Sequence, residues 1–172
     1  GRVYFRNHLM NFNSAKEAID HGFALITEER KANGLFLKGD LTFNTTIANL
    51  KQYKSGIALS DSKMEKATAE EIKTMRTKCM GPNDMISNLS GGNQQKVVVA
   101  KALSQEMKVV IMDEPTKGVD VGAKAEIYGI MGDLAKKGYA IILISSEMPE
   151  ILGMSDRIIV MCNGRKTGEL DK

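Results

Sequence analysis

The sequence contains no tryptophan, and only 5% of its residues are aromatic. No apolar run reaches the 18 residues that a membrane-spanning helix requires, and the first ten residues lack the apolar centre of a signal peptide. The formal net charge is only +3, and no run of five Lys or Arg residues occurs. Composition therefore gives no support to a membrane-spanning chain or to a nucleic-acid-binding one, and we expect no nucleic acid among the partners.

Cysteine and histidine are also scarce. The two cysteines, Cys79 and Cys162, lie far apart and match no metal-ligand spacing, so we expect both to be reduced in a cytosolic setting. We interpret the two histidines, His8 and His21, as surface or loop residues.

The 172 residues are 42% hydrophobic, which is enough for one domain or part of one. The chain starts inside a segment with strand character, so we interpret Gly1 as a fragment boundary. Apolar runs, hairpin turns and capping residues predict strands over residues 2–6, 23–27, 109–112, 139–145, 158–162 and 167–170, and helices over residues 14–21, 44–50, 61–78, 121–137 and 148–153. This order predicts an α/β fold with a mainly parallel sheet, a helical insertion over about residues 43–89 and a closing β-hairpin at Asn163-Gly164.

The predicted strand 109–112 runs directly into two carboxylates, Asp113 and Glu114. A buried strand that ends in acid is the Walker B arrangement, because the strand holds the first carboxylate rigidly at the edge of the sheet. Asp113 can then hold Mg²⁺, usually through water, while Glu114 can polarise an attacking water molecule. The motif is only moderately specific, because an ordinary solvated strand end can carry the same residues.

Residues 89–93, Leu-Ser-Gly-Gly-Asn, open a further helix, and we call them the signature turn. Unpaired N–H groups and the positive end of the helix dipole favour phosphate there, and glycine lets the backbone approach it. An ordinary Ser N-cap explains the turn equally well when it is taken alone.

A charged cluster, Glu28-Glu-Arg-Lys31, follows the predicted strand 23–27. Ligand sites form at the carboxyl ends of strands in α/β sheets. From the sequence alone, a ligand site and a solvated loop are equally good readings of this cluster.

Taken together, LSGGNQQKVVVAKAL followed by VVIMDEPTKGVD resembles the ATP-binding-cassette (ABC) ATPases, and the resemblance covers essentially the whole chain. It implies a partial ABC cassette with core residues 1–41, a helical subdomain 42–89, and the signature helix and Walker B core over 90–172. It implies Asp113 as the metal residue and Glu114 as the catalytic residue. The implied nucleotide-binding residues are Ser90, Gly91, Gly92, Asn93 (where the family usually has Gln), Asp120 of the D-loop at residues 118–121, Glu28 and Ser146.

AIDHGFALITEERKANGLF and ISSEMPEILGMSDRIIVMCNG narrow the resemblance to the second cassette of monosaccharide importers of the galactose or ribose type. This implies ATP and Mg²⁺ as cofactors, and a parent subunit that couples ATP hydrolysis to sugar uptake from the cytoplasmic side of the plasma membrane. The implied partners are a second cassette, a transmembrane permease and, indirectly, a periplasmic or extracellular sugar-binding protein. Cassettes of this family pair head to tail, so Ser90, Gly91 and Gly92 would complete the partner's ATP site, whereas Asp113, Glu114 and Ser146 would belong to this cassette's own site.

This cassette's own ATP site departs from the family pattern in three places. The 172 residues contain no G-x-x-x-x-G-K-[ST] phosphate loop, and Ser146 stands where the family has its switch histidine. Glu28 stands where most of the family has Gln, as is usual for second cassettes of this sugar-importer type. We therefore expect the isolated chain to bind ATP weakly or not at all and to hydrolyse it negligibly. Tyr4 and Phe5 are not obvious substitutes for the aromatic residue that stacks on adenine.

Two other classes of protein share part of this pattern. A non-enzymatic module that binds a permease or a partner cassette also fits a chain without a phosphate loop. DNA-repair and chromosome-maintenance ATPases share the signature and Walker B motifs, but residues 42–89 are too short for the long coiled coil of those proteins.

Overall fold

A computed structural model of the chain describes residues 2–171. The strands are β1 (Val3–Phe5), β2 (His8–Met10), β3 (Phe23–Ile26), β4 (Lys54–Ser55), β5 (Ala58–Leu59), β6 (Val109–Asp113), β7 (Ala140–Ile144), β8 (Arg157–Cys162) and β9 (Arg165–Asp171). The α-helices are α1 (Ala15–Asp20), α2 (Leu41–Thr46), α3 (Asp61–Thr74), α4 (Gly91–Leu103), α5 (Val121–Lys136) and α6 (Met148–Met154). A π-helical turn covers Arg30–Gly34, and 3-10 turns cover Ile47–Tyr53 and Ile86–Asn88.

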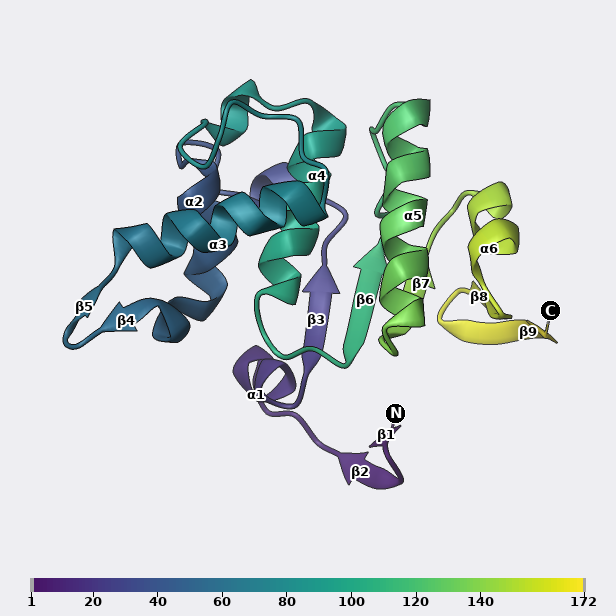
Figure 1. Cartoon of the computed structure of the whole chain (residues 1–172). Helices are drawn as coiled ribbons and strands as arrows, with labels where there is room; N and C mark the ends of the chain where they lie inside the picture. The colour runs from purple at the N-terminus through teal and green to yellow at the C-terminus, as the bar shows by residue number, and fades with distance from the viewer. Residues whose placement is uncertain (1, 172) are drawn as a thin grey trace.

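The centre of the molecule is a three-stranded parallel sheet in the order β3-β6-β7. The helices α4 and α5 pack on one face of this sheet (Figure 1). The side chains that point toward the helices are fully buried, among them Ile26, Val110 and Met112. Ile127, Met131 and Leu134 of α5 close the core from the helix side, as the spacing of apolar residues in that helix predicts.

The opposite face of the sheet is largely uncovered. The strand register places Leu25, Ile111 and Ile142 side by side across it. Leu25 is 58% exposed and Ile142 is 50% exposed. The prediction that residues 139–145 form a buried strand is therefore wrong for one of its two faces. Helices normally bury both faces of a parallel sheet, but within residues 2–171 the face that carries Leu25 and Ile142 remains exposed.

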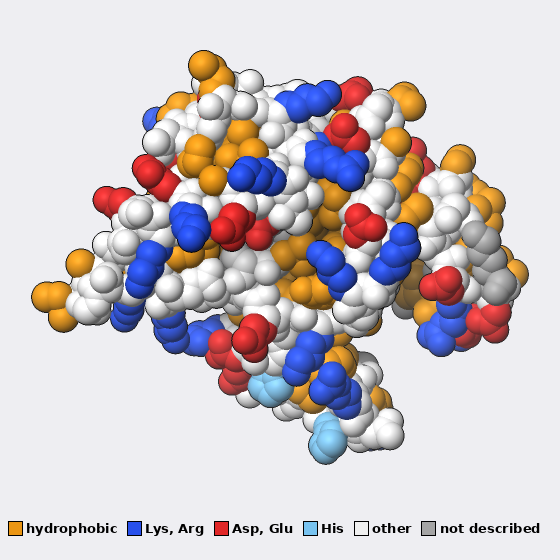
Figure 2. All heavy atoms as spheres, viewed as in Figure 1, with side chains coloured by type: hydrophobic (Ala, Val, Ile, Leu, Met, Phe, Trp, Pro, Cys, Tyr) orange, Lys and Arg blue, Asp and Glu red, His pale blue; other side chains and the backbone are white. Residues whose placement is uncertain are grey.

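The helices α2 and α3 lie beside the sheet with the short hairpin β4–β5 (Figure 1). The tip of this hairpin is apolar and fully solvated, as the orange atoms at the far left of Figure 2 show, and Ile57 lies there. On the same view positive and negative side chains are interspersed. On the other side of the sheet lie α6 and the antiparallel hairpin β8–β9, in which Asn163 and Gly164 have positive φ angles of 48° and 74°, as the predicted two-residue turn requires.

The fold class is confirmed as mixed α/β with a parallel sheet and a C-terminal β-hairpin, but several boundaries differ from the predictions. The helix predicted over 44–50 is α2 followed by a 3-10 turn, and the helix predicted to reach residue 78 ends at Thr74. Residues 51–56, for which no strand is predicted, contain β4. His8 lies in strand β2 rather than in a loop, although it is exposed as expected. No helix within residues 2–171 is long and apolar enough to cross a membrane.

Candidate functional site

The carboxyl ends of β3, β6 and β7 meet at one edge of the sheet because the three strands are parallel. Glu28 follows β3, Asp113 and Glu114 end β6, and Ser146 follows β7. Four of the predicted site residues thus come from three neighbouring strands. This is the edge at which open α/β sheets bind their ligands.

Glu114 and Ser146 are in direct contact. The backbone N–H of Ser146 donates to the Glu114 carboxylate over 2.7 Å, and the Glu114 N–H donates to the carbonyl of Ile144 over 2.9 Å. Glu114 has φ +46°, a conformation that residues other than glycine rarely adopt. Strained backbone of this kind persists where the surrounding structure holds it, and it is often found at functional sites.

Asp113 is half-buried at the end of β6. No cluster of three or more His, Cys, Asp or Glu side chains able to hold a metal ion occurs among residues 2–171. Mg²⁺ is usually held by only one or two carboxylates together with water and phosphate oxygens. The donor set at this edge therefore fits Mg²⁺ that arrives with a nucleotide, and Asp113 is the residue that would hold it.

Three cationic side chains around this edge have partners within the chain. Lys117 forms an ion pair with Glu28, and this hydrogen bond and charge raise the pKa of Lys117 above its ordinary value. Lys124 donates to both carboxylate oxygens of Glu147, over 2.5 and 2.7 Å, which raises the pKa of Lys124 in the same way. Arg30 donates to backbone carbonyls. These three cations are thus engaged within the chain, and the carboxylates at this edge supply oxygen donors of the kind that Mg²⁺ takes.

The signature turn begins the 13-residue helix α4. Ser90 is the N-cap, and its hydroxyl accepts hydrogen bonds from the backbone N–H of Asn93 over 3.5 Å and from the Asn93 side-chain amide over 2.9 Å. The side-chain oxygen of Asn93 accepts from the N–H of Lys78 over 2.9 Å. Asn93 therefore ties the start of α4 to the chain that leaves α3, and Ser90 remains exposed with a hydroxyl proton to donate.

Packing explains why the two positions of the turn are glycine, which the sequence alone did not show. A Cβ atom at Gly92 would lie 2.3 Å from the Cβ of Ala123 in α5, and a Cβ at Gly91 would lie 2.8 Å from Nη2 of Arg30. The predicted D-loop residue Asp120 is the N-cap of α5, where its carboxylate accepts from the N–H of Ala123 over 3.0 Å. The signature turn and the D-loop segment are thus packed directly against each other.

Two contacts around the site were not predicted. Arg30 lies in the charged cluster that the sequence pointed out, but the sequence could not show that it reaches residues 117 and 118. Glu150 of α6 is only 3% exposed, and its carboxylate accepts from the Thr116 hydroxyl over 3.1 Å. Burial, and after it the charge of Glu150, raise the pKa of the neighbouring Tyr128. Nothing in the local sequence pattern identifies Glu150 as a buried acid.

The fold and this edge of the sheet define an ATP-binding cassette, and comparison with known proteins agrees. The family model described as ABC transporter matches residues 1–117. The chain belongs to the ABC transporter family.

Curated relatives in that family include galactose/methyl galactoside import ATP-binding proteins MglA. The chain is 52% identical over 168 residues to the protein of Treponema denticola, and 48% identical over 172 residues to that of Escherichia coli K12. These matches cover 98% and 99% of this chain but 34% of each relative, so the chain spans about a third of the length of the curated relatives it matches.

Solved ABC cassettes have the same fold. The ADP conformation of the cassette MJ1267 superposes with a TM-score of 0.81 at 24% identity, over 99% of this chain and 69% of that one. The dimeric, post-hydrolysis cassette MJ0796 bound to ADP and Pi superposes with a TM-score of 0.79 at 22% identity, over 99% of this chain and 73% of that one.

Proposed function

We propose that the chain is part of the ATP-binding subunit of an ABC importer for monosaccharides and belongs to its second cassette. The parent subunit couples ATP hydrolysis to sugar uptake. The identity of 52% to an importer subunit of T. denticola supports this proposal. The structural observation that carries it is the edge of the sheet at which Asp113 lies beside Glu114, with the Glu114 carboxylate bound to the N–H of Ser146.

In this proposal the two motifs serve different ATP molecules. Asp113 holds Mg²⁺ at this cassette's own site, Glu114 polarises the attacking water, and Ser146 and Glu28 line the same site. The signature turn, with Ser90 exposed beside the D-loop residue Asp120, faces the nucleotide of a partner cassette. The dimeric form of the solved cassette MJ0796 supports a pairing of this kind. ATP, when bound, supplies the phosphate that is transferred to water.

We propose further that this chain alone does not hydrolyse ATP. A polyphosphate needs a cradle of N–H groups and a free cation, and the family provides both through a glycine-rich loop that ends in Lys. The 172 residues contain no such loop. Lys117 and Lys124 form ion pairs with Glu28 and Glu147, so either would have to break its pair before it could act as that lysine.

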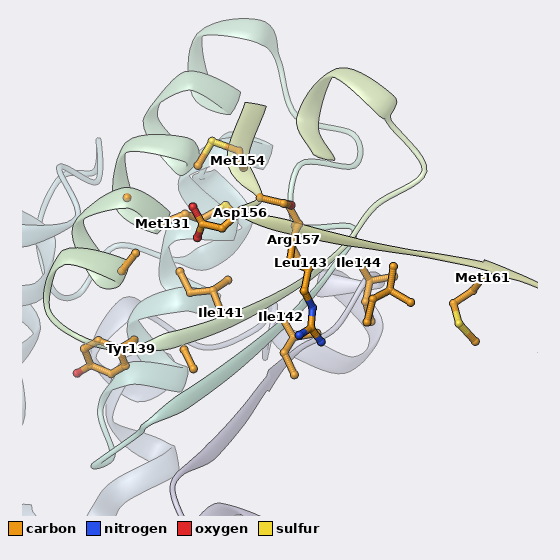
Figure 3. Close-up of a pocket in the computed structure, with 15 residues that line it drawn as sticks. Met131, Tyr139, Ile141, Ile142, Leu143, Ile144, Met154, Asp156, Arg157 and Met161 are labelled. Carbon is orange, nitrogen blue, oxygen red and sulfur yellow. The ribbon is translucent and has the colours of Figure 1, made fainter. Parts of the chain in front are cut away.

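The incomplete sheet supports the same conclusion. A groove of about 720 Å³ lies between β7 and β8. Figure 3 shows Ile142 and Ile144 of β7 around this groove together with Arg157 and Met161 of β8. Ile144 is 48% exposed and Met161 is 61% exposed. We propose that a strand from outside residues 2–171 lies in this groove, that a helix following it covers the open face of the sheet, and that the loop between them reaches Asp113 and Glu114.

A second candidate function is that of a binding module for the permease. It is favoured by two exposed aromatic residues, Phe36 and Phe43, which are 53% and 40% exposed. The rings of Phe36 and Phe43 meet edge to face at a centroid distance of 5.2 Å. We propose that residues 42–89 form the helical subdomain that meets the membrane subunits, between core residues 1–41 and 90–172. This contact would hold the protein peripherally on the cytoplasmic side of the plasma membrane, with the sugar-binding protein reached only through the permease.

One pair of measurements tests these proposals. We expect no saturable binding of a fluorescent ATP analogue to the purified chain, and phosphate release no faster than from the Glu114→Gln variant. Release that the Glu114→Gln substitution abolishes would contradict the proposed inactivity. A detergent-solubilised permease of a galactose importer should retain the chain without nucleotide, and the variant Phe43→Asp, in α2 of that subdomain, should bind more weakly. Leu170→Asp, at a partly exposed apolar site in β9 and outside residues 42–89, serves as the matched control.

A further inference from the structure

Arg30 is the first residue of the π-helical turn that follows β3, and its guanidinium reaches the loop between β6 and α5. Nη1 donates to the carbonyl of Lys117 over 2.8 Å, and Nη2 donates to the carbonyl of Gly118 over 3.3 Å. Two adjacent carbonyls are thus held by one planar fork, which fixes the direction of the loop as well as its position. Gly118 has φ +65°, so the loop makes a left-handed turn at this point.

The same guanidinium lies against the signature turn. A Cβ built on Gly91 would come within 2.8 Å of Nη2 of Arg30 and within 3.2 Å of the Gly118 carbonyl oxygen. Three segments therefore meet at Arg30: the turn after β3, the signature turn and the D-loop segment. The glycine at position 91 leaves the space that the guanidinium fills.

Two further observations show that the contact of Arg30 with the loop is specific. Nε of Arg30 is buried without a hydrogen-bond partner, so the side chain has given up water in order to reach the two carbonyls. The ion pair between Glu28 and Lys117 joins the same two segments a second time through side chains. Two of the five N–H donors of Arg30 are thus used to hold the backbone of the loop.

We propose that Arg30 is a positioning residue that locks the D-loop segment and the signature turn into one rigid surface, and that it couples this surface to the turn after β3. A displacement of residues 28–34 then moves the D-loop. The proposal deepens the function proposed above, since it concerns the surface that would face the partner cassette. The contact itself involves only residues of this chain and no nucleotide.

Hydrogen exchange on the whole chain, without nucleotide, tests the coupling. The N–H groups of Lys117 and Val119 donate to Glu114 and Thr116 within the loop, so they report its order. We expect Arg30→Ala to reduce their protection by about ten-fold or more, because two charge-assisted hydrogen bonds are lost. Arg30→Lys should give an intermediate value, since an ammonium group lacks the planar fork. Added guanidinium ion should restore protection in Arg30→Ala, and Arg165→Ala, in the exposed β9 strand, should leave it unchanged.

A double-mutant cycle makes the test specific to the contact with Gly91. Gly91→Ala should reduce protection of the same loop because its methyl group displaces the guanidinium, but it should add little in the Arg30→Ala background. Unchanged loop protection in Arg30→Ala would overturn the proposal. An equal loss of protection in the core strand β6 would also overturn it, because it would show a general loss of stability. So would a failure of added guanidinium ion to restore loop protection in Arg30→Ala. Absence of ATP binding or of permease binding leaves these exchange results unaffected, so the failure of the proposed function and the failure of this proposal are distinguishable.

Discussion

At Gly92 a single added methyl group would lie 2.3 Å from the Cβ of Ala123, far inside the van der Waals contact distance. We expect Gly92→Ala to lower the free energy of unfolding by about 1 to 3 kcal/mol, the usual cost of overpacking a filled site. Ala123→Gly removes the opposing atom, so the double variant should regain part of the loss, less the cost of about 1 kcal/mol of a glycine in a helix. Urea denaturation measures both effects. Gly129→Ala, in α5 with open space around it, is the matched control and should not destabilise the chain. If the effects of the two substitutions on the free energy of unfolding were simply additive, the helices would be free to move apart at this contact.

Lys96 is a second residue on which the packing of α4 depends. Its side chain is fully buried, with the ammonium 2.5 Å from the Glu126 carboxylate and donating to the Arg76 carbonyl over 2.8 Å. The hydrogen bond from Lys96 and its charge hold the pKa of Glu126 below its ordinary value of 4.5. The folded state therefore binds this proton less tightly than the unfolded state does. The stabilisation is present above the unfolded pKa and is lost as the pH falls through the lower folded pKa.

We therefore expect Glu126→Gln to lower the free energy of unfolding by about 1 to 2 kcal/mol at pH 7, because the buried ammonium loses its counter-charge while the carboxylate is partly solvated. The difference from wild type should shrink as the pH falls below about 4, where the wild-type carboxyl group is also neutral. Denaturation curves at several pH values measure it. Asp133→Asn, which breaks the exposed 3.9 Å pair with Lys136, should change stability by less than about 0.5 kcal/mol. A difference between Glu126→Gln and wild type that does not vary with pH would contradict this account.

At the scale of the element, the sequence predicted those helices and strands whose signals are local. Ser14, Ser60, Ser90 and Asp120 all cap helices as side-chain chemistry suggests, and Asn163-Gly164 makes the expected hairpin turn. The end of α3 was misplaced because a long-range contact sets it. Arg76 adopts φ +50° and offers its carbonyl to Lys96, which lies 20 residues further along the chain. Periodicity within 61–78 contains no information about that lysine.

The candidate site shows the same difference between local signals and long-range contacts. Asp113, Glu114 and Ser90 were identifiable from a strand or helix terminus and the residue types beside it. The hydrogen bonds around them were not, because they join residues far apart in the chain. Ser146 lies 32 residues from Glu114, and Arg30 lies 87 residues from Lys117, whose carbonyl it binds. The uncovered face of β7 was missed for a related reason. An apolar run shows that a strand prefers burial, but it does not show whether this chain supplies the covering segment.

At the scale of the whole molecule, the outer edge of β7 and the groove beside it predict assembly with a further segment. We expect a segment of the T. denticola relative from outside the matched 168 residues to bind this chain in trans. Free strand edges offer unpaired N–H and C=O groups to an incoming strand, and the exposed row of Leu25 and Ile142 offers apolar area to a covering helix. Hydrogen exchange should then show the amides of β7 becoming protected by about ten-fold or more on mixing.

The substitution Ile142→Lys should prevent this gain of protection, because it places a charge on the sheet face that the incoming segment would bury. Ile57→Lys changes an equally apolar and fully exposed residue at the tip of the β4–β5 hairpin, away from the groove, and should leave assembly intact. The Ile142→Lys variant should also fold as well as the wild-type chain when it is alone, since residue 142 is half exposed there, and urea denaturation of the unmixed proteins checks this. Assembly that is equally strong in both variants would place the contact elsewhere on the molecule. Loss of assembly in Ile142→Lys alone would locate it at the groove between β7 and β8, and ATP binding by the mixed proteins would then show that the phosphate cradle comes from the added segment.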